Sequence, residues 1–217
     1  MFTILERNEI TLIRDRSSFI GVLIHATSVE SVKQYLLDIR KQYPKAKHYC
    51  YAYIINGQKK CSDDGEPAKT AGRPLLELLE KKEMNETLLI VVRYFGGVLL
   101  GASRLMSTYL ETGVQVINSA DIVEIENKFI YKMVLSYQDY DELQRFAKRD
   151  GFAIENPKFE DKISVDVLAD ESYAGVLADA FPHAEIEVSG QKKVYRRWRL
   201  WLTQMNTQEE EMNYLIY

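Results

Sequence analysis

Residues 61–109 decide the fold: CSDDGEPAKTAGRPLLELLEKKEMNETLLIVVRYFGGVLLGASRLMSTY. Near the centre, residues 88–92 form a short aliphatic run between polar residues and glycines, which predicts a buried strand. The strand leaves through Gly96 and Gly97, and a helical stretch begins near Gly101. Backbone N–H groups at such a helix start suit a phosphate or another anion. The alternative is a tight connection without a ligand, because glycine turns are common.

Two arginines flank this turn and would supply positive charge to a bound anion. The predicted anion or nucleic-acid site consists of Arg93, Gly96, Gly97, Gly101 and Arg104. The spacing from Gly96 to Ser103 is that of a Walker A loop, but Ala102 occupies the position of the phosphate-binding lysine. NTP hydrolysis is therefore not expected.

An acidic turn precedes the first helix of this stretch. Asp63, Asp64 and Glu66 carry the oxygen ligands that a hard cation prefers, but their spacing is not that of an EF-hand. Nothing else in the sequence completes a ligand shell, so we predict no metal site and no cofactor. The more economical role is structural, with the carboxylates accepting hydrogen bonds from turn N–H groups and nearby side chains. The candidate donors are Thr70, Arg73 and Arg93.

A second basic segment lies near the C-terminus, at residues 192–201. On a strand, one face would carry Lys193, Tyr195, Arg197, Arg199 and Trp201. Cations that alternate with aromatic rings pair with phosphates and stack on bases. In the alternative, the opposite face is core and the cations are a solvated surface. This strand is the second candidate nucleic-acid site, and we favour it over the glycine turn.

Composition limits the function. The 217 residues carry a formal net charge of −4, which argues against a protein that coats duplex DNA indiscriminately but leaves room for a local basic patch. No stretch approaches the roughly 20 apolar residues of a bilayer span, and the first residues lack the apolar core of a signal peptide. We expect a cytoplasmic protein. Its two cysteines, Cys50 and Cys61, are expected to be reduced.

Hydrophobic periodicity predicts an α+β fold in two tandem domains. Strands are expected at residues 9–14, 19–25, 48–55, 58–62 and 88–92, and helices at 29–42, 74–82 and 101–117. The pattern restarts at Phe129 in the order β-α-β-β-α-β, which predicts a ferredoxin-like unit whose last two strands surround a turn at Gly190. The predicted domains are residues 1–126 and 127–204, followed by an acidic tail at 205–217.

Several of these motifs together resemble the IMPACT / YigZ family. The strings SDDGEP-AKTAGRP and RYFGG-VLLGASRLMSTY carry the resemblance, and RSSFI at 16–20 and HYCYAY at 48–53 add to it. The positions that match the family motif are Asp63, Asp64, Gly65, Glu66, Pro67, Thr70, Gly72, Arg73, Tyr94 and Phe95. This chain departs from the pattern at Leu99, where the family usually has lysine, and at Ser103, Arg104 and Ser107.

The resemblance implies both a fold and a function. It implies an N-terminal α/β sandwich like the second domain of a small-subunit ribosomal protein, followed by a smaller ferredoxin-like domain. It also implies a non-enzymatic, translation-associated protein that binds RNA, the ribosome or a translation factor. The departures mean that an anion site at the glycine turn is either moved or lost. The alternative is an enzyme or binding protein that acts on a phosphorylated small molecule at the acidic and glycine turns.

Overall fold

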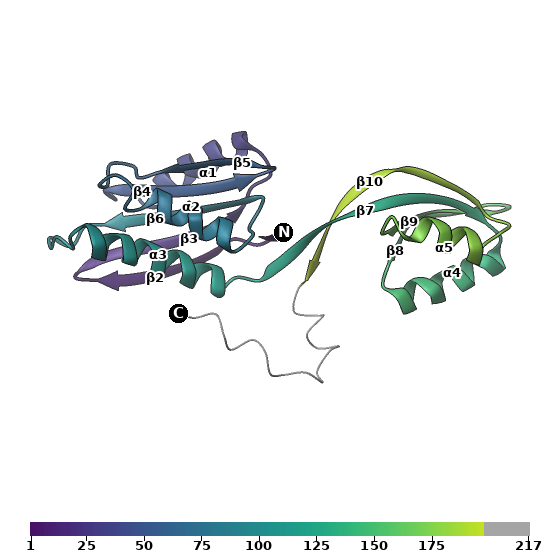
Figure 1. Ribbon diagram of the computed structural model, residues 1–217. Helices are drawn as coiled ribbons and strands as arrows, with labels where there is room; N and C mark the ends of the chain where they lie inside the picture. Colours follow the sequence, from purple (N-terminus) through teal and green to yellow (C-terminus); the bar gives the residue numbers. More distant parts are fainter. Residues whose placement is uncertain (198–217) are drawn as a thin grey trace. The chain divides into compact units, whose positions relative to one another are not determined.

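The computed structural model describes residues 1–197, which form an α+β structure with two β-sheets (Figure 1). The chain divides into two compact units. The N-terminal unit holds Met1–Glu124 together with Arg196 and Arg197, and the C-terminal unit holds Ile125–Tyr195. Within the described residues, no helix combines the length and the apolar composition that a bilayer span requires.

A five-stranded sheet forms the centre of the N-terminal unit, in the order β2-β3-β6-β4-β5. Helices α2 and α3 cover one face of this sheet, and α1 covers the other (Figure 1). The strands are β2 (Asn8–Arg14), β3 (Ser17–His25), β4 (His48–Ile55), β5 (Gln58–Ser62) and β6 (Thr87–Tyr94). The helices are α1 (Val29–Gln42), α2 (Gly72–Lys81) and α3 (Ala102–Asn118).

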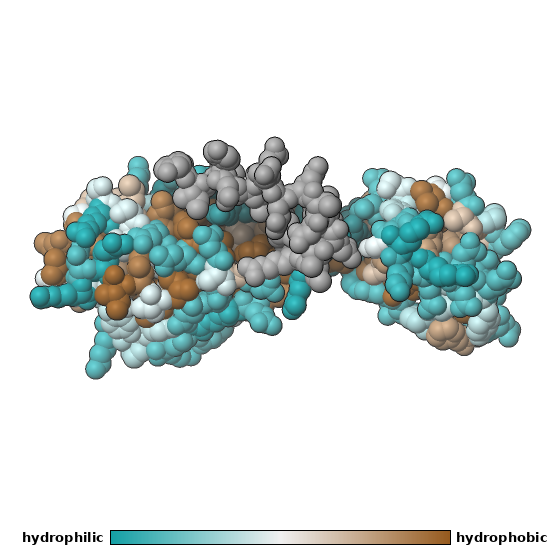
Figure 2. Space-filling view, turned by 90° about the horizontal axis from the view of Figure 1, so that it is seen from below, coloured by the Kyte–Doolittle hydropathy of each residue, from teal (hydrophilic) through white to brown (hydrophobic). Residues whose placement is uncertain are grey.

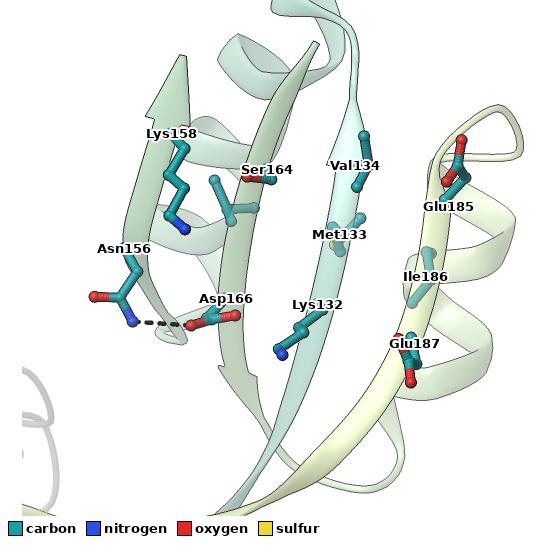
Figure 3. Close-up of a pocket in the computed structure, with 11 residues that line it drawn as sticks. Lys132, Met133, Val134, Asn156, Lys158, Ser164, Asp166, Glu185, Ile186 and Glu187 are labelled. Carbon is teal, nitrogen blue, oxygen red and sulfur yellow. Dashed lines mark hydrogen bonds between the residues drawn. The ribbon is translucent and has the colours of Figure 1, made fainter. Parts of the chain in front are cut away.

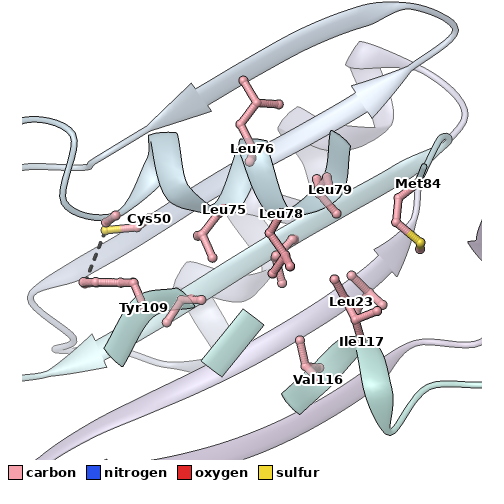
Figure 4. Close-up of a cluster of buried hydrophobic side chains, with 14 of the residues drawn as sticks. Leu23, Cys50, Leu75, Leu76, Leu78, Leu79, Met84, Tyr109, Val116 and Ile117 are labelled. Atoms are coloured by element: carbon pink, nitrogen blue, oxygen red, sulfur yellow. Dashed lines mark hydrogen bonds between the residues drawn. The ribbon is translucent and has the colours of Figure 1, made fainter. Parts of the chain in front are cut away.

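Strand β6 lies in the middle of this sheet and is buried on both faces, as the aliphatic run predicts. Leu89 and Val91 pack into the cluster beneath α2 and α3, part of which Figure 4 shows. Leu88, Ile90 and Val92 point into the opposite cluster, beneath α1. Because both faces of the strand are covered, it needs apolar residues at every position rather than at alternate ones.

Two strands differ from the sequence-based prediction in this part of the chain. A short strand, β1 (Phe2–Ile4), was not predicted, and it pairs with the start of β7 (Ile122–Leu135). Its three residues are too few to show a strand period. The strand forms because it pairs with a segment far along the chain, and such pairing leaves no local pattern in the sequence. Strand β7 is continuous and runs through the predicted domain boundary between residues 126 and 127.

The C-terminal unit contains the predicted β-α-β-β-α-β order. Its sheet has the order β10-β7-β9-β8, and a hydrophobic cluster that includes Leu143 and Leu177 lies between the sheet and two helices. The remaining elements are α4 (Tyr137–Asp150), β8 (Ala153–Phe159), β9 (Ile163–Ala169), α5 (Tyr173–Ala180) and β10 (Glu185–Arg197). The predicted turn at Gly190 is wrong, because Gly190 takes φ +148° inside a continuous β10.

We predict that residues 1–126 and 127–204 each fold when expressed alone. The physical reason is that each unit encloses hydrophobic clusters of its own residues. Each half should unfold cooperatively in urea, followed by circular dichroism. If neither half shows a cooperative transition while the full chain does, the division into two domains is wrong.

Candidate functional site

The acidic turn begins with Asp63, which caps helix α2 from a distance. Its Oδ1 accepts hydrogen bonds from the backbone N–H groups of Ala71 (3.0 Å) and Gly72 (2.8 Å), and its Oδ2 accepts one from Lys69 (2.9 Å). A carboxylate that accepts hydrogen bonds from the otherwise unpaired N–H groups at a helix start stabilises the helix. The helix therefore begins at Gly72, two residues before the predicted start at Pro74.

Asp64 joins the same turn to α1 and β4. Its Oδ1 accepts a hydrogen bond from the Arg40 guanidinium at 2.8 Å, and its Oδ2 accepts one from the backbone N–H of Tyr49 at 2.7 Å. The Asp64 carbonyl oxygen lies 2.9 Å from Nδ1 of His48. Both carboxylate oxygens of Asp64 are therefore used within the fold.

Glu66 forms a buried ion pair with Arg93. The Arg93 Nη1 donates to Glu66 Oε1 at 2.7 Å, and the two side chains are only 6% and 4% exposed, respectively. The Tyr109 hydroxyl donates to the same Oε1 at 2.7 Å. Among the three acids that the sequence left open as partners of Arg93, the structure selects Glu66. This ion pair connects the acidic turn to the strand that leads into the glycine turn.

Two aromatic rings flank the Arg93 guanidinium. Its Cζ lies 5.2 Å from the centre of the Phe19 ring and 5.5 Å from that of Phe95, distances at which a cation is attracted to a ring face. The other expected donors do not reach the acidic turn's carboxylates: Arg73 pairs with Glu77 at 2.6 Å, and the Thr70 hydroxyl donates to the Pro67 carbonyl. Arg93 is thus held below the surface by Glu66 and the two rings.

Cys50 and Tyr109 extend this buried cluster. The Cys50 Sγ lies 3.3 Å from the Tyr109 hydroxyl oxygen, a contact drawn in Figure 4. Burial raises the pKa of the Cys50 thiol, and burial together with Cys50 and Glu66 raises the pKa of the Tyr109 hydroxyl. Both groups are therefore protonated at neutral pH, and a protonated thiol is a poor nucleophile. Cys50 and Cys61 are both free cysteines.

The glycine turn lies against the hairpin between β2 and β3. The Gly96 N–H donates to Ser17 Oγ at 3.1 Å, and a Cβ on Gly96 would overlap the backbone carbonyl group of Arg16. Gly97 and Gly101 take φ +85° and +78°, in the left-handed region that favours glycine. Glycine at position 96 therefore permits a close approach, whereas glycine at the other two positions permits an unusual backbone conformation.

Helix α3 begins immediately after this turn. Gly101 supplies no side-chain cap, and the first turn of the helix carries no acidic residue. Arg104 is 57% exposed, and its Nη1 lies 3.1 Å from Asp15 Oδ2. Among the predicted anion-site residues, the structure thus places Gly97, Gly101 and Arg104 at the surface and buries Arg93 in an ion pair.

The second candidate site lies on β10. Lys193 and Arg197 are exposed on this strand, and Tyr195 between them is partly buried. Arg197 Nε lies 3.8 Å from Asp121 Oδ2, and the Arg197 side chain is 65% exposed. The further predicted members of this site, Arg199 and Trp201, lie outside the described residues, as does the predicted acidic tail.

A groove of about 630 Å³ lies on the face of the C-terminal sheet opposite its helices (Figure 3). Lys132 and Lys158 line it from β7 and β8, and Glu185 and Glu187 line it from β10. Asn156 donates to Asp166 across its floor at 2.8 Å. The sequence did not indicate this groove, because its polar residues are scattered over separate strands. The mixture of signs does not favour any one ligand charge.

Comparison with known proteins agrees with these motifs. Residues 15–117 match the model of the Impact N-terminal domain. The chain is 28% identical over 181 residues to IMPACT family member YvyE of Bacillus subtilis, a match that covers 82% of this chain and 83% of the relative. It is 40% identical over 99 residues to IMPACT family member YigZ of Escherichia coli, covering 43% and 48%, respectively.

Two further comparisons extend the match. An IMPACT family member of Haemophilus influenzae is 35% identical over 134 residues, covering 59% of this chain and 64% of the relative. The match therefore spans less than two thirds of the Escherichia and Haemophilus proteins. A solved structure of a hypothetical protein has a TM-score of 0.58 at 25% identity and covers 86% of this chain and 96% of its own. The acidic turn, the glycine turn and these matches show that the chain belongs to the IMPACT / YigZ family.

Proposed function

We propose that the protein is a non-enzymatic, cytoplasmic binding protein associated with translation, and that it contacts RNA or a ribosomal or translation factor. The association with translation is supported by membership of the IMPACT / YigZ family, because the resemblance to that family implies a translation-associated protein. We further propose that the N-terminal unit is related to the second domain of a small-subunit ribosomal protein and that the C-terminal unit is ferredoxin-like. The sheet order β10-β7-β9-β8, with two helices on one face, supports the second assignment.

One observation carries the choice of binding over catalysis. Each carboxylate of the acidic turn is already used inside the fold: Asp63 caps α2, Asp64 binds Arg40, and Glu66 pairs with Arg93. An enzyme that used this turn would need at least one carboxylate placed to reach a substrate. Because all three carboxylates hold the turn in place, a structural role accounts for their presence in the family motif. This observation favours a binding function over a catalytic one.

For RNA, the β10 site is the better candidate of the two. Affinity for a polyanion requires cations close to its phosphates, and the overall charge of this chain is negative. At the glycine turn, Glu66 neutralises Arg93, and Asp15 partly neutralises Arg104. On β10, Lys193 and Arg197 are exposed, Arg197 Nε lies 3.8 Å from Asp121 Oδ2, and the partly buried tyrosine between the two exposed cations offers a stacking surface, an arrangement that the glycine turn lacks.

Replacing Arg197 and Arg199 with Gln is expected to weaken RNA binding. The salt dependence of binding should also flatten, by roughly 0.7 units of log–log slope for each phosphate of the single strand that the variant no longer neutralises. The measurement is fluorescence anisotropy of a labelled single-stranded RNA at several salt concentrations. Replacing Lys59 and Lys60 with Gln, on β5, removes the same charge from exposed positions elsewhere and serves as the matched control. Arg104→Gln should have a smaller effect than the β10 variant.

Two results would count against this proposal. If the Arg197/Arg199 variant binds RNA like the parent and with the same slope, the β10 site is wrong. If the parent chain turns over a phosphorylated small molecule, and Asp64→Asn or Glu66→Gln abolishes that turnover without unfolding the chain, the enzyme alternative is correct.

A further inference from the structure

An apolar surface lies exposed on the loop between β6 and α3 and on the outer side of α3. Its members are Phe95, Val98, Leu99, Met106 and Leu110, with exposed fractions of 42%, 40%, 88%, 43% and 39%. We name it the α3 apolar surface. Helical spacing in the sequence predicts Leu105, Tyr109 and Leu110 on the buried face of this helix; the structure buries Leu105 and Tyr109 but leaves Leu110 exposed. Figure 2 shows hydrophobic residues gathered at the end of the N-terminal unit where Figure 1 places this loop.

The shape of this surface suits a second helix. Met106 and Leu110 are one helical turn apart on α3, and Val98 and Leu99 precede the first turn, so the apolar residues continue along the helix. Of the exposed residues between them, Ala102, Ser103 and Ser107 are small, whereas Arg104 is long and charged. Large side chains that alternate with small ones form the ridges and grooves by which helices pack, at about 8–10 Å between axes.

The chemistry of the surface favours a protein over RNA. The side chains of Val98, Leu99, Met106 and Leu110 offer neither a charge for a phosphate nor a ring for a base. The single aromatic ring, Phe95, already lies against the Arg93 guanidinium. Aliphatic side chains gain most when another apolar surface removes them from water. An exposed apolar patch of this kind is typical of protein–protein contact.

The charges at its edge indicate the sign of the partner. Helix α3 presents its positive N-terminal end here, with no acid in its first turn. Arg104 and Arg16 are exposed beside the glycine turn, and Asp15 is the acid that Arg104 contacts. This surrounding is net positive, so carboxylates on a partner would be favoured there and cations disfavoured.

We propose that the α3 apolar surface docks an amphipathic helix of a partner protein, with acidic residues beside its apolar face. The inference rests on the proposed binding function. It specifies the kind of protein partner that would bind beside the glycine turn, namely an amphipathic helix that carries acidic residues. Nucleic acid, in contrast, is assigned to β10. The two surfaces are therefore predicted to respond to different substitutions.

The test uses the full chain and a synthetic helical peptide with leucines at helical spacing and glutamates beside them. The peptide should bind, and replacing Leu99, Met106 and Leu110 together with Ser should weaken its binding roughly tenfold or more. The same peptide with lysines in place of the glutamates should bind the parent chain several-fold more weakly. Leu37→Ser, which removes a 55%-exposed leucine from α1 on the opposite face, should leave binding unchanged.

Three outcomes would overturn the proposal. In the first, the peptide binds no better than a scrambled peptide of equal composition, or the triple variant binds as the parent does. In the second, sedimentation velocity shows a dimer that the triple variant converts to a monomer, so that a second copy occupies the surface. In the third, the triple variant loses RNA binding, so that the surface serves RNA. If only the RNA-binding test of Arg197 and Arg199 contradicts its prediction, the RNA site on β10 is wrong and the proposal for the α3 apolar surface is unaffected.

Discussion

Replacing Glu66 with Gln is expected to lower the free energy of unfolding by about 3–5 kcal/mol, the usual cost of breaking a buried ion pair from one side. The Arg93 side chain is 6% exposed, so its charge would remain buried without a counterion. Its Nε already has no hydrogen-bond partner among the described residues. The guanidinium therefore depends on Glu66 and on the Phe19 and Phe95 rings.

Urea denaturation followed by circular dichroism measures this effect. The matched control is Asp64→Asn, in the same turn, where the paired side chains of Asp64 and Arg40 are 26% and 46% exposed; this change should cost about 1 kcal/mol. Replacing both Glu66 and Arg93 with Met should recover much of the loss, because no unpaired charge is then buried. A Glu66→Gln chain within about 1 kcal/mol of the parent would show that the pair does not hold the two turns together.

Gly96→Ala is expected to cost about 3 kcal/mol or more, because the added methyl group has no room. It would overlap the Arg16 carbonyl group and lie 2.5 Å from the backbone nitrogen of Ser17. These are backbone atoms of the β2–β3 hairpin, so relief requires the hairpin and the glycine turn to separate. The hydrogen bond from the Gly96 N–H to Ser17 Oγ would then break as well.

Gly97→Ala is the control, since it changes the adjacent residue. A Cβ at Gly97 meets nothing within 4 Å, but its φ of +85° strains an alanine by about 1–2 kcal/mol. Thermal or urea unfolding of both variants gives the comparison. Equal losses at the two positions would mean that backbone conformation, rather than close approach to Arg16, explains both glycines.

Local patterns predicted much of the N-terminal unit. The aliphatic run at 88–92 predicted β6, because a strand covered on both faces needs apolar residues throughout. Helical spacing predicted α1, whose first turn is capped by Ser28, with the Ser28 side chain accepting a hydrogen bond from the Ser31 N–H. In contrast, β1 and the unbroken β7 depend on pairing between distant segments, which leaves no local period to read.

The candidate sites were predicted less completely. The motif placed three acids in one turn, but spacing alone does not say which of them points toward Arg93, 27 residues farther along the chain than Glu66. Burial decided this, since Glu66 alone of the three lies in the core with Tyr109. The α3 apolar surface was missed because a residue such as Leu110, on the helix face that the sequence predicts to be buried, looks like a core residue when its exposure is unknown.

A protein that acts by binding, with RNA held at β10, should show a salt-dependent affinity for single strands. The measurement is the anisotropy of a labelled single-stranded RNA titrated with the parent chain over a range of salt concentrations. If Lys193, Arg197 and Arg199 each contact a phosphate, the plot of the logarithm of the binding constant against the logarithm of the salt concentration should have a slope of about −2, at roughly 0.7 per contact for single strands. We expect binding at low salt that weakens with this slope. No binding at the lowest salt concentration would contradict RNA binding and leave a protein partner as the remaining candidate.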